Sequence, residues 1–476
     1  MEQFNAAYRN LFSLAELTPK GWYLQQLHIQ RDGLSGHLDE FWPDVKDSRW
    51  IGGASDGWER LPYWLDGYIP LARLLNDPQM MRKAKDYVDA ILARQQPDGW
   101  ICPVSQQERD HYDLWAAFLV AKVLVVWHDA TQDARIEDAV AGLLQCIHRH
   151  IRRHTLFNWS QFRWYECLIP LLWLYERRPE EWLVHLAKEL QAQGFDWNAY
   201  FREWPSTAPT PQGQWSQMSH VVNNAMMLKY PALLMRLFPE EAAVNMAADM
   251  LRQLDEWHGS ANGTFTGDEC LAGQSPSAGT ELCAVAELMY SLQWIQTQSD
   301  DVAWGDRLEK LAFNAWPATF DPAMWVHQYV QQANQMQAVP VEHPVYRTNG
   351  PEANTFGLEP EFGCCTANLS QGWPKLIQSV YYRRGTGIDI AVYLPSRLDT
   401  QINGHPVSVQ IDTDYPFRST VSVTIENSHG ISFPLRLRIP GWASDASLLY
   451  QQKRQPCSAG RYVTISPAPG TTAETA

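Results

Sequence analysis

Apolar residues recur at spacings of three and four from about residue 5 to residue 320, and this spacing lines one face of an α-helix. Turn residues separate the apolar stretches, as in the Pro-Asp-Gly-Trp sequence of residues 97–100. The pattern predicts ten helices, over residues 61–77, 81–96, 114–130, 134–151, 165–177, 179–193, 220–238, 240–259, 279–298 and 304–316.

The connections between these helices are alternately short and long, which favours helices that pair antiparallel. We expect the pairs to close into an (α/α)6-type toroid over residues 1–380, which makes the fold mainly α. In a toroid the long loops gather at one end of the ring and shape a cleft there. A simple bundle and an open solenoid are the competing arrangements.

Beyond residue 385 the spacing of apolar residues changes to about two, which is the period of a β-strand. The segments GIDIAVYLPSRLD, VSVQIDTDY, STVSVTIEN and FPLRLRIPGW are expected to be strands separated by turn residues. They predict a small antiparallel β-sandwich domain over residues 381–465, either minimal or incomplete. Residues 466–476 are small and polar, and we expect a disordered tail there.

Composition and charge narrow the class of partner. The net charge of −15 argues against nucleic acid and anionic membranes. No stretch reaches the roughly 18 apolar residues of a membrane span, and the first residues do not resemble a signal peptide, so we expect a cytoplasmic protein. We further expect a monomer or a homodimer. The 22 tryptophans hint at a carbohydrate cleft, because aromatic faces stack on sugar rings, although large helical cores also use tryptophan.

Two short segments carry candidate metal ligands. The sequence TELC provides Glu281 and Cys283 at a turn-rich helix start, and the sequence EFGCC provides Cys364 and Cys365 in a Gly-containing loop about 80 residues later. Three thiolates and one carboxylate suit tetrahedral zinc. The alternative is that Cys283 is a small core residue and that the cysteine pair is inert.

A bound zinc ion would also favour chemistry at sulfur, because it removes the thiol proton at neutral pH. One cysteine ligand could then attack carbon, while a nearby carboxylic acid protonates the leaving group. Glu269, in a loop upstream of the ligands, is the candidate acid. This is the double-displacement chemistry of a retaining glycosidase with sulfur as the nucleophile. The alternative is a solvent-facing or helix-capping glutamate.

Several motifs together resemble those of glycoside hydrolase family 127, the β-L-arabinofuranosidases. These motifs are GDECLAG, TELC, CCTAN, TDYPF and LRLRIPGW, and the likeness extends from about residue 20 to residue 445. The resemblance implies that Cys364 is both nucleophile and zinc ligand, and that Glu269 is the acid/base. It also implies that Glu281, Cys283 and Cys365 complete the zinc site and that His220 binds the sugar.

Two regions differ from the family pattern, in which further histidines contact the sugar. The sequences HYDLW and FRWYEC place Tyr112, Arg163 and Glu166 there instead, and we expect these three side chains to bind the substrate. An arginine facing the sugar would suit an acidic group. Asp66, beside aromatic residues, is also expected to line the sugar site, with helix capping as the alternative.

The resulting expectation is a retaining exo-glycosidase, similar to a β-L-arabinofuranosidase, that uses Zn²⁺ and acts on an oligosaccharide or glycoconjugate. Residues 1–380 would be its catalytic domain. Two other functions remain open. One is a polysaccharide lyase or sugar epimerase on the same helical ring, and the other is a non-catalytic carbohydrate-binding protein with a structural zinc.

Overall fold

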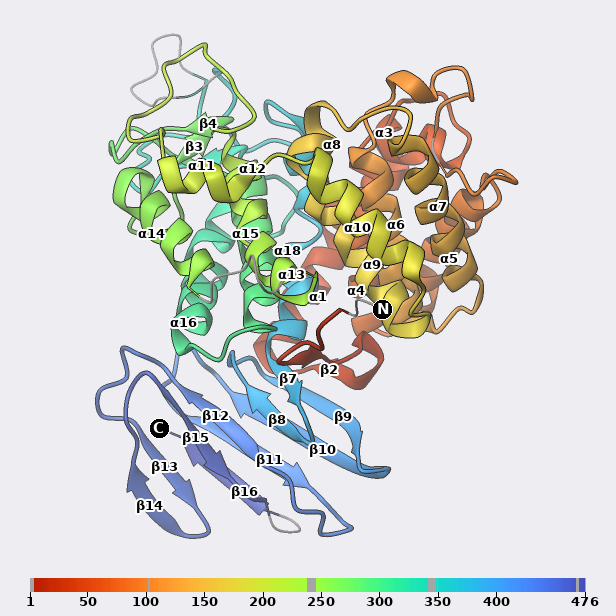
Figure 1. The fold of residues 1–476 in the computed structure, drawn as a ribbon. Coiled ribbons are helices and arrows are strands. Elements are labelled where there is room, and N and C mark those ends of the chain that lie inside the picture. The colour runs from red at the N-terminus through yellow and green to blue at the C-terminus, as the bar shows by residue number, and fades with distance from the viewer. Residues whose placement is uncertain are drawn as a thin grey trace.

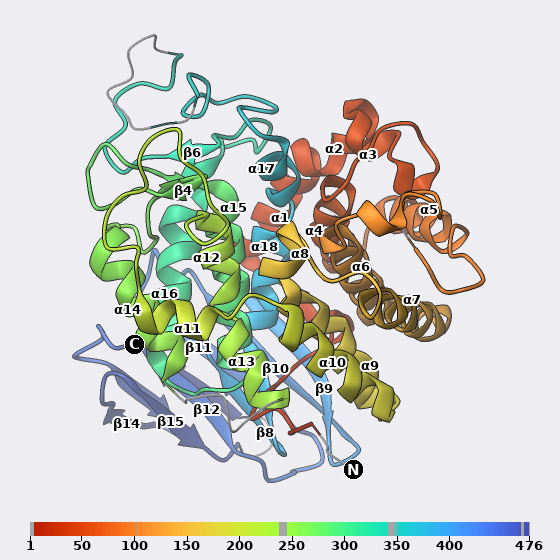
Figure 2. The ribbon, with the colours of Figure 1, turned by 45° about the horizontal axis from the view of Figure 1, so that its top comes forward.

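The larger domain of the computed structural model is a double ring of helices (Figures 1 and 2). The structure describes residues 4–101, 103–237, 245–340, 348, 350–467 and 471–475. Within these residues, six inner segments form the ring: α4 (Arg60–Leu74), α6 (Trp115–Thr131), the 3-10 turn η4 (Trp164–Cys167) with α9 (Leu168–Arg177), α12 (Val221–Met227) with α13 (Tyr230–Leu237), α15 (Leu282–Gln296), and α17 (Gly363–Asn368) with α18 (Gly372–Leu376).

Each inner segment has an outer helix packed against it. In the same order, the outer helices within the described residues are α5 (Pro78–Leu92), α7 (Arg135–Ile151), α10 (Glu181–Gln193), α14 (Met246–His258), α16 (Val302–Lys310) and α1 (Gly21–Asp32). This arrangement confirms the predicted (α/α)6 toroid. Four shorter helices lie between these elements: α2 (Leu34–Phe41), α3 (Pro43–Lys46), α8 (Asn158–Phe162) and α11 (Trp197–Glu203).

The two ends of the helical domain close the ring, because the first helix packs against the last. In α1, the hydroxyl of Tyr23 donates to the carbonyl of Trp373 in α18 at 2.6 Å. The Gln30 amide donates to the carbonyl of Leu369 at 3.1 Å. Gly67 of α4 lets the same segment approach closely, since a Cβ there would lie 2.1 Å from the carbonyl oxygen of Ser370.

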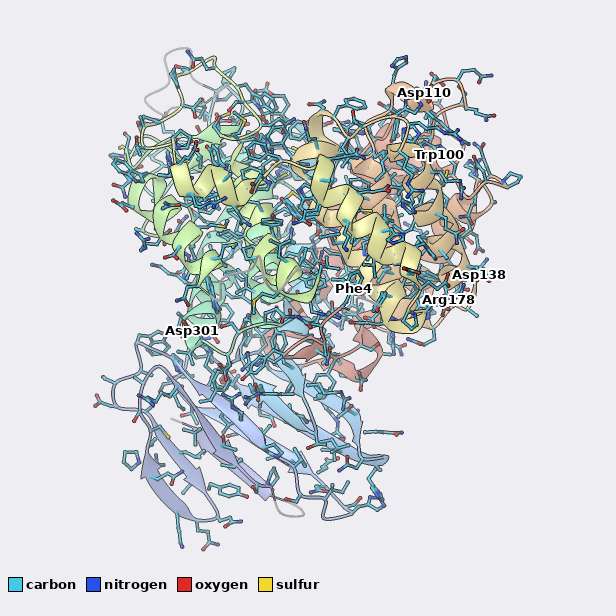
Figure 3. The ribbon with its side chains drawn as sticks, viewed as in Figure 1. Phe4, Trp100, Asp110, Asp138, Arg178 and Asp301 are labelled. Atoms are coloured by element: carbon cyan, nitrogen blue, oxygen red, sulfur yellow. The ribbon has the colours of Figure 1, made fainter. Side chains whose placement is uncertain are left out.

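The helices follow the predicted pattern where apolar spacing is strong. In α15, 13 of the 15 residues are buried, as expected for a helix enclosed on all sides. The predicted helix 220–238 is divided into α12 and α13, and the predicted helix 304–316 is α-helical only to Lys310. On the outer surface, Arg178 Nη2 lies 2.6 Å from Asp138 Oδ1 and ties α9 to α7 (Figure 3).

Six buried charged side chains meet inside the inner ring, and we call them the charge ring. Each inner segment contributes one, and the sign alternates from segment to segment: Asp66, Lys122, Glu166, Lys229, Glu287 and Lys375. Their side chains are 0–9 % exposed. Charges this deeply buried need partners, because desolvation of an unpaired ion costs several kcal/mol.

The pairing is close around α4 and α6. Lys122 Nζ lies 2.9 Å from Asp66 Oδ2 and 3.9 Å from Glu166 Oε2. Lys375 Nζ lies 2.8 Å from the same Asp66 oxygen. Asp66 and Glu166 were expected to bind the sugar. Both carboxylates are buried and paired with lysines inside the ring, and a role in sugar binding stays a prediction.

Tyr290 of α15 faces three of the ammonium groups. Its ring centroid lies 3.5 Å from Lys375 Nζ, 5.0 Å from Lys122 Nζ and 5.1 Å from Lys229 Nζ. An aromatic face attracts cations, so Tyr290 supplements the carboxylates. Burial lowers the pKa of Lys375 to about 8, in spite of the opposing effect of Asp66.

Two sheets form the smaller domain below the helices (Figure 1). The first has the strand order β1 (Asn10–Leu11), β7 (Tyr381–Arg384), β8 (Gly387–Ile390), β12 (Leu435–Ile439) and β15 (Arg461–Ile465). The second has the order β14 (Lys453–Pro456), β13 (Ser447–Tyr450), β16 (Thr471–Thr475), β11 (Val421–Glu426), β10 (His405–Thr413), β9 (Ser396–Ile402) and β2 (Leu17–Pro19). Pairing is antiparallel except between β8 and β12.

Strands β9, β10 and β11 alternate buried and less buried residues, in agreement with the predicted period of two. The expected disordered tail 466–476 is corrected in part, because β16 pairs with both β11 and β13 and its backbone joins a ladder on each side. Strands β1 and β2 come from the N-terminal segment, and each joins one of the two sheets. The predicted domain boundary at residue 380 did not include this contribution.

A third, small sheet lies in the helical domain, at the end opposite the β domain (Figure 1). Its order is β4 (Cys270–Leu271), β3 (Gly267–Asp268), β5 (Thr280–Glu281) and β6 (Val330–Gln331). Over the described part of the chain, none of the helices combines the length and apolar character that crossing a bilayer requires.

Replacing one lysine of the charge ring tests its energetic importance. Lys122→Met leaves Asp66 and Glu166 buried without that ammonium group, and we expect a loss of about 3–5 kcal/mol of stability. Lys85→Met is the control, because it removes an exposed pair with Asp89 worth less than about 1 kcal/mol. Urea unfolding followed by circular dichroism measures both, and equal midpoints would contradict the expectation.

Candidate active site

Four predicted ligand residues meet at one point. The ligand atoms of Glu281, Cys283, Cys364 and Cys365 all lie within 4.8 Å of one another. The sulfur atoms of Cys283 and Cys365 are 3.2 Å apart, and the Cys365 thiol lies 3.8 Å from Glu281 Oε1. Residues separated by about 80 positions in the chain therefore form a single cluster, which we call the sulfur cluster.

The change from strand to helix aligns Glu281 with Cys283. Glu281 ends β5 with an extended backbone (φ −64°, ψ 137°), and α15 begins at the next residue. The Leu282 amide donates to the Tyr329 carbonyl at 2.9 Å and fixes this junction. Within a regular helix, residues i and i+2 would point about 200° apart. The expected irregular helix start is thus confirmed.

The other two sulfur atoms come from the first turn of α17, where the sequence analysis expected a loop. The Asn368 amide donates to Cys283 Sγ at 3.1 Å and connects α17 to α15. His327 supports the same turn, with Nε2 at 3.0 Å from Thr366 Oγ1. Burial lowers the pKa of His327 to about 4, so its ring is neutral at physiological pH.

Hydrogen bonds connect the sulfur cluster to the charge ring. Asn368, which contacts Cys283, accepts a hydrogen bond from the Gln371 amide. Gln371 in turn accepts from Lys375 Nζ at 2.8 Å. Lys375 belongs to the charge ring, so the position of the cysteine helix is coupled to the buried ion pairs below it.

Only one member of the sulfur cluster is partly exposed. Glu281, Cys283 and Cys365 are 0–1 % exposed, whereas Cys364 is intermediate. Hydrogen bonds from the Cys283 and Cys365 thiols lower the pKa of Cys364 well below its usual value. Burial raises the pKa of Glu281 well above its usual value. Cys364 is therefore the sulfur that an outside molecule can reach.

The sulfur cluster could bind a metal ion. Glu281 Oε2 is buried and has no hydrogen-bond partner among the described residues. A tetrahedral ion with metal–sulfur distances of roughly 2.3 Å needs sulfur atoms roughly 3.8 Å apart. The sulfur atoms of Cys283 and Cys365 would need to separate only slightly from 3.2 Å. The donor set and its spacing thus fit one ion.

A second group lies directly beside the first and shares Glu281 with it. Ligand atoms of His220, Glu269 and Glu281 also lie within 4.8 Å of one another. Glu269 sits at the tip between β3 and β4 with a left-handed backbone (φ 60°), an uncommon conformation for a non-glycine residue that is often found at functional sites. A Cβ at Gly267 would lie 2.4 Å from Val221 Cβ, so glycine permits β3 to pack against α12.

Three donors surround the carboxylate of Glu269. The Tyr329 hydroxyl donates to Oε1 at 2.7 Å, and the Trp215 indole donates to Oε2 at 3.0 Å. His220 Nε2 lies 3.4 Å from Oε2. Burial raises the pKa of Glu269, but the opposing effects of His220, Tyr329 and Trp215 are larger together. The resulting pKa is about 2, below the usual value for a glutamate. These contacts favour the carboxylate form.

His220 is held in one orientation by the start of α12. Its Nδ1 accepts from the backbone N–H of Asn223 at 3.2 Å, which leaves Nε2, the atom that faces Glu269, as the protonated nitrogen. The Trp159 ring lies edge-on to it, with centroids 5.1 Å apart. His220 is thus a fixed hydrogen-bond donor.

Arg163 lies next to this group but is not a free cation. Its guanidinium lies 4.5 Å from the Trp115 ring and 4.4 Å from the Trp159 ring. Its Nε donates to Asn223 Oδ1 at 2.7 Å, and its Nη1 lies 3.5 Å from Glu59 Oε2. The guanidinium of Arg163 already has Glu59 and two aromatic rings as partners. The expectation that it binds an acidic group on the sugar is therefore weaker.

Glu59 was missed by the sequence analysis. Burial raises its pKa to about 7, while the nearby Arg163 lowers it and Cys364 raises it. Its Oε2 accepts from the Trp115 indole at 2.6 Å. The local sequence GWER gives no sign of this environment, because the partners come from other helices.

The remaining predicted residues lie in different places. Tyr112 follows the 3-10 turn η3 (Arg109–His111) and is partly buried against the core, and its role in substrate binding stays a prediction. Asp66 and Glu166 belong to the charge ring. The structure therefore brings together Cys364, Cys365, Cys283, Glu281, Glu269 and His220.

A ring of paired helices with a reachable cysteine and a hydrogen-bonded carboxylate at one end has the layout of a toroid enzyme. A family model described as the GH127 β-L-arabinofuranosidase catalytic domain matches residues 52–378, and a model of the GH127 middle domain matches residues 387–469. The chain therefore belongs to glycoside hydrolase family 127, as the sequence motifs suggested. It is a glycosidase with a carbohydrate substrate, rather than a lyase, an epimerase or a non-catalytic binding protein.

Solved structures agree with this fold. A GH127 β-L-arabinofuranosidase from Geobacillus stearothermophilus T6 is 18 % identical with a TM-score of 0.75, and the match covers 98 % of this chain and 81 % of that one. A GH127 β-arabinofuranosidase is 13 % identical with a TM-score of 0.73, covering 98 % and 80 %. No curated protein matches the chain.

The difference in burial within the sulfur cluster predicts selective alkylation. In metal-free protein, iodoacetamide should modify Cys364 first among the seven described cysteines, because the other six are buried. Peptide mass spectrometry over a time course measures the order, and Cys364→Ser provides the control that removes the early product. Earlier modification of Cys283 or Cys365 would contradict the described burial.

Proposed function

We propose that this glycosidase is a retaining exo-enzyme that removes a terminal β-L-arabinofuranosyl residue from an oligosaccharide. Cys364 is the nucleophile and Glu269 is the acid/base. The observation that supports this most is that Cys364 alone in the sulfur cluster is partly exposed, while Glu269 lies in the neighbouring group that shares Glu281. The names of the solved relatives suggest the sugar.

The reaction proceeds in two steps that return the enzyme to its starting state. The Cys364 thiolate attacks C1 of the sugar and forms a C–S bond, while the C1–O bond breaks and the leaving oxygen takes the proton from Glu269. Water then attacks C1, its proton passes to Glu269, and the C–S bond breaks to release the thiolate.

Protonated Glu269 is needed in the first step, although its donors favour the carboxylate. The Cys364 thiolate lies close to it and opposes its ionisation, and a bound sugar that excludes water does the same. His220 Nε2 and the Tyr329 hydroxyl hold the carboxyl in position throughout. We further propose that His220, Arg163 and Tyr112 orient the sugar.

The four members of the sulfur cluster are proposed to bind zinc. Three sulfur donors and one carboxylate favour zinc over magnesium or calcium, which prefer oxygen. When bound, zinc would keep Cys364 deprotonated at neutral pH and moderate its basicity. Asn368, which donates to Cys283 Sγ, would orient that ligand from outside the cluster.

Trapping of the covalent intermediate tests the nucleophile. Wild-type protein mixed with p-nitrophenyl β-L-arabinofuranoside and quenched in acid should gain the mass of one glycosyl group, on the peptide that contains Cys364. Cys364→Ser should show no adduct, and Glu269→Gln should lower kcat by about 10²–10⁴-fold. Cys457→Ser, a buried cysteine of the β domain, is the matched control. An adduct that persists in Cys364→Ser would exclude the proposed nucleophile.

Metal analysis tests the zinc site separately. Purified wild-type protein should contain one zinc per chain by inductively coupled plasma mass spectrometry. Cys283→Ala should contain far less, because the cluster loses one of three thiolates. Cys457→Ser should retain the wild-type content. Equal zinc content in Cys283→Ala and the wild type would place the metal elsewhere.

A further inference from the structure

Two large aromatic side chains that contact Glu269 or its donor Tyr329 are exposed to solvent. Trp215 is 47 % exposed and Phe362 is 42 % exposed. Their position at the acid/base group calls for a functional explanation.

Trp215 contacts Glu269 directly. Its indole N–H donates to Oε2 at 3.0 Å, which fixes the ring next to the carboxylate. The ring also lies edge-on to Trp159 and His220, with centroids 5.5 Å and 5.9 Å away. The indole is thus held by Glu269, Trp159 and His220, while about half of the Trp215 surface remains exposed.

Phe362 is linked to the other carboxylate oxygen of Glu269 through Tyr329. Its ring lies edge-on to Tyr329, with centroids 5.4 Å apart, and the Tyr329 hydroxyl donates to Glu269 Oε1 at 2.7 Å. Phe362 also precedes Cys364 by two residues, at the start of α17. Each oxygen of Glu269 therefore has a hydrogen-bond donor and an exposed aromatic ring associated with it.

We propose that Trp215 and Phe362 form the binding site for the leaving group, which is the second sugar ring of the oligosaccharide. The inference rests on the proposed function and names the residues that bind this second ring. An acid/base residue must touch the oxygen that joins the two parts of a glycoside. Whatever is attached to that oxygen on the far side from the nucleophile must lie against the exposed surroundings of Glu269.

The chemistry of the two rings favours a sugar over a small alcohol. Sugar rings present C–H groups on their faces, which pack against aromatic faces, while their hydroxyl groups remain in water. Two half-exposed rings offer this contact at little cost in conformational entropy. A methyl group or a similarly small leaving group would leave most of both rings uncovered.

A comparison of two substrates with the same glycone tests the proposal. The measured quantity is kcat/KM for a β-L-arabinofuranosyl-arabinose disaccharide divided by kcat/KM for methyl β-L-arabinofuranoside. Phe362→Leu keeps an apolar side chain against Tyr329 but removes the aromatic face, and we expect it to lower this ratio at least about fivefold. Phe362→Tyr restores a ring and should recover the ratio.

Trp257→Ala is the matched control, because Trp257 is 38 % exposed on the outer helix α14. It should retain the wild-type ratio. An unchanged ratio in Phe362→Leu, with both substrates still cleaved, would overturn the leaving-group site and leave the proposed function intact. A wild-type enzyme that cleaves neither glycoside would overturn both.

Competition between acceptors tests Trp215 independently. In the second step, an acceptor hydroxyl can replace water: its oxygen bonds to C1, the C–S bond breaks, and its proton passes to Glu269. Trp215→Gln keeps an N–H donor for Glu269 but removes the ring. With arabinose and methanol competing, we expect the ratio of disaccharide to methyl glycoside formed to fall at least about fivefold. An unchanged ratio in Trp215→Gln would overturn the proposed role of Trp215.

Discussion

The alternating charges inside the helical ring are the constraint on which the active site depends. A buried ion pair contributes little net stability, but an unpaired buried ion is strongly unfavourable, so the charges penalise any other arrangement of the inner helices. Lys375 illustrates the effect. It must reach Asp66, and its second contact, with Gln371, orients Asn368 and thereby Cys283. The ion pairs thus set the register of the helix that carries the cysteines.

Glu281 connects the two halves of the site. It lies within 4.8 Å of both the sulfur atoms and the His220–Glu269 pair, although it is almost completely buried. A carboxylate in this position fixes the distance between a nucleophile and an acid/base that come from different segments. The donors around Glu269 thus hold its carboxylate beside a second carboxyl group whose pKa is raised by burial.

Local signals determined how much could be predicted from sequence. Strong apolar periodicity located the inner helices, and the turn-rich segment before Glu281 correctly indicated an irregular helix start. The charge ring could not be predicted because its members stand alone in separate apolar segments. The sequence around Asp66 shows its aromatic neighbours but gives no sign of its two lysine partners. Glu59 and His327 depend on partners from distant elements. Strand β16 depends on two neighbouring strands, whereas its own sequence is only small and polar.

The closure of the ring by its first helix determines when this enzyme can be assembled. Helix α1 leaves the ribosome early, yet its packing partner α18 is synthesised about 340 residues later. At translation rates of about 5–20 residues per second, α1 waits roughly 17–70 s for that partner. The cysteines of α17 are made in the same late stretch. A nascent chain therefore carries an open, apolar half-ring with no complete active site, and it acquires catalysis and a closed core at nearly the same moment.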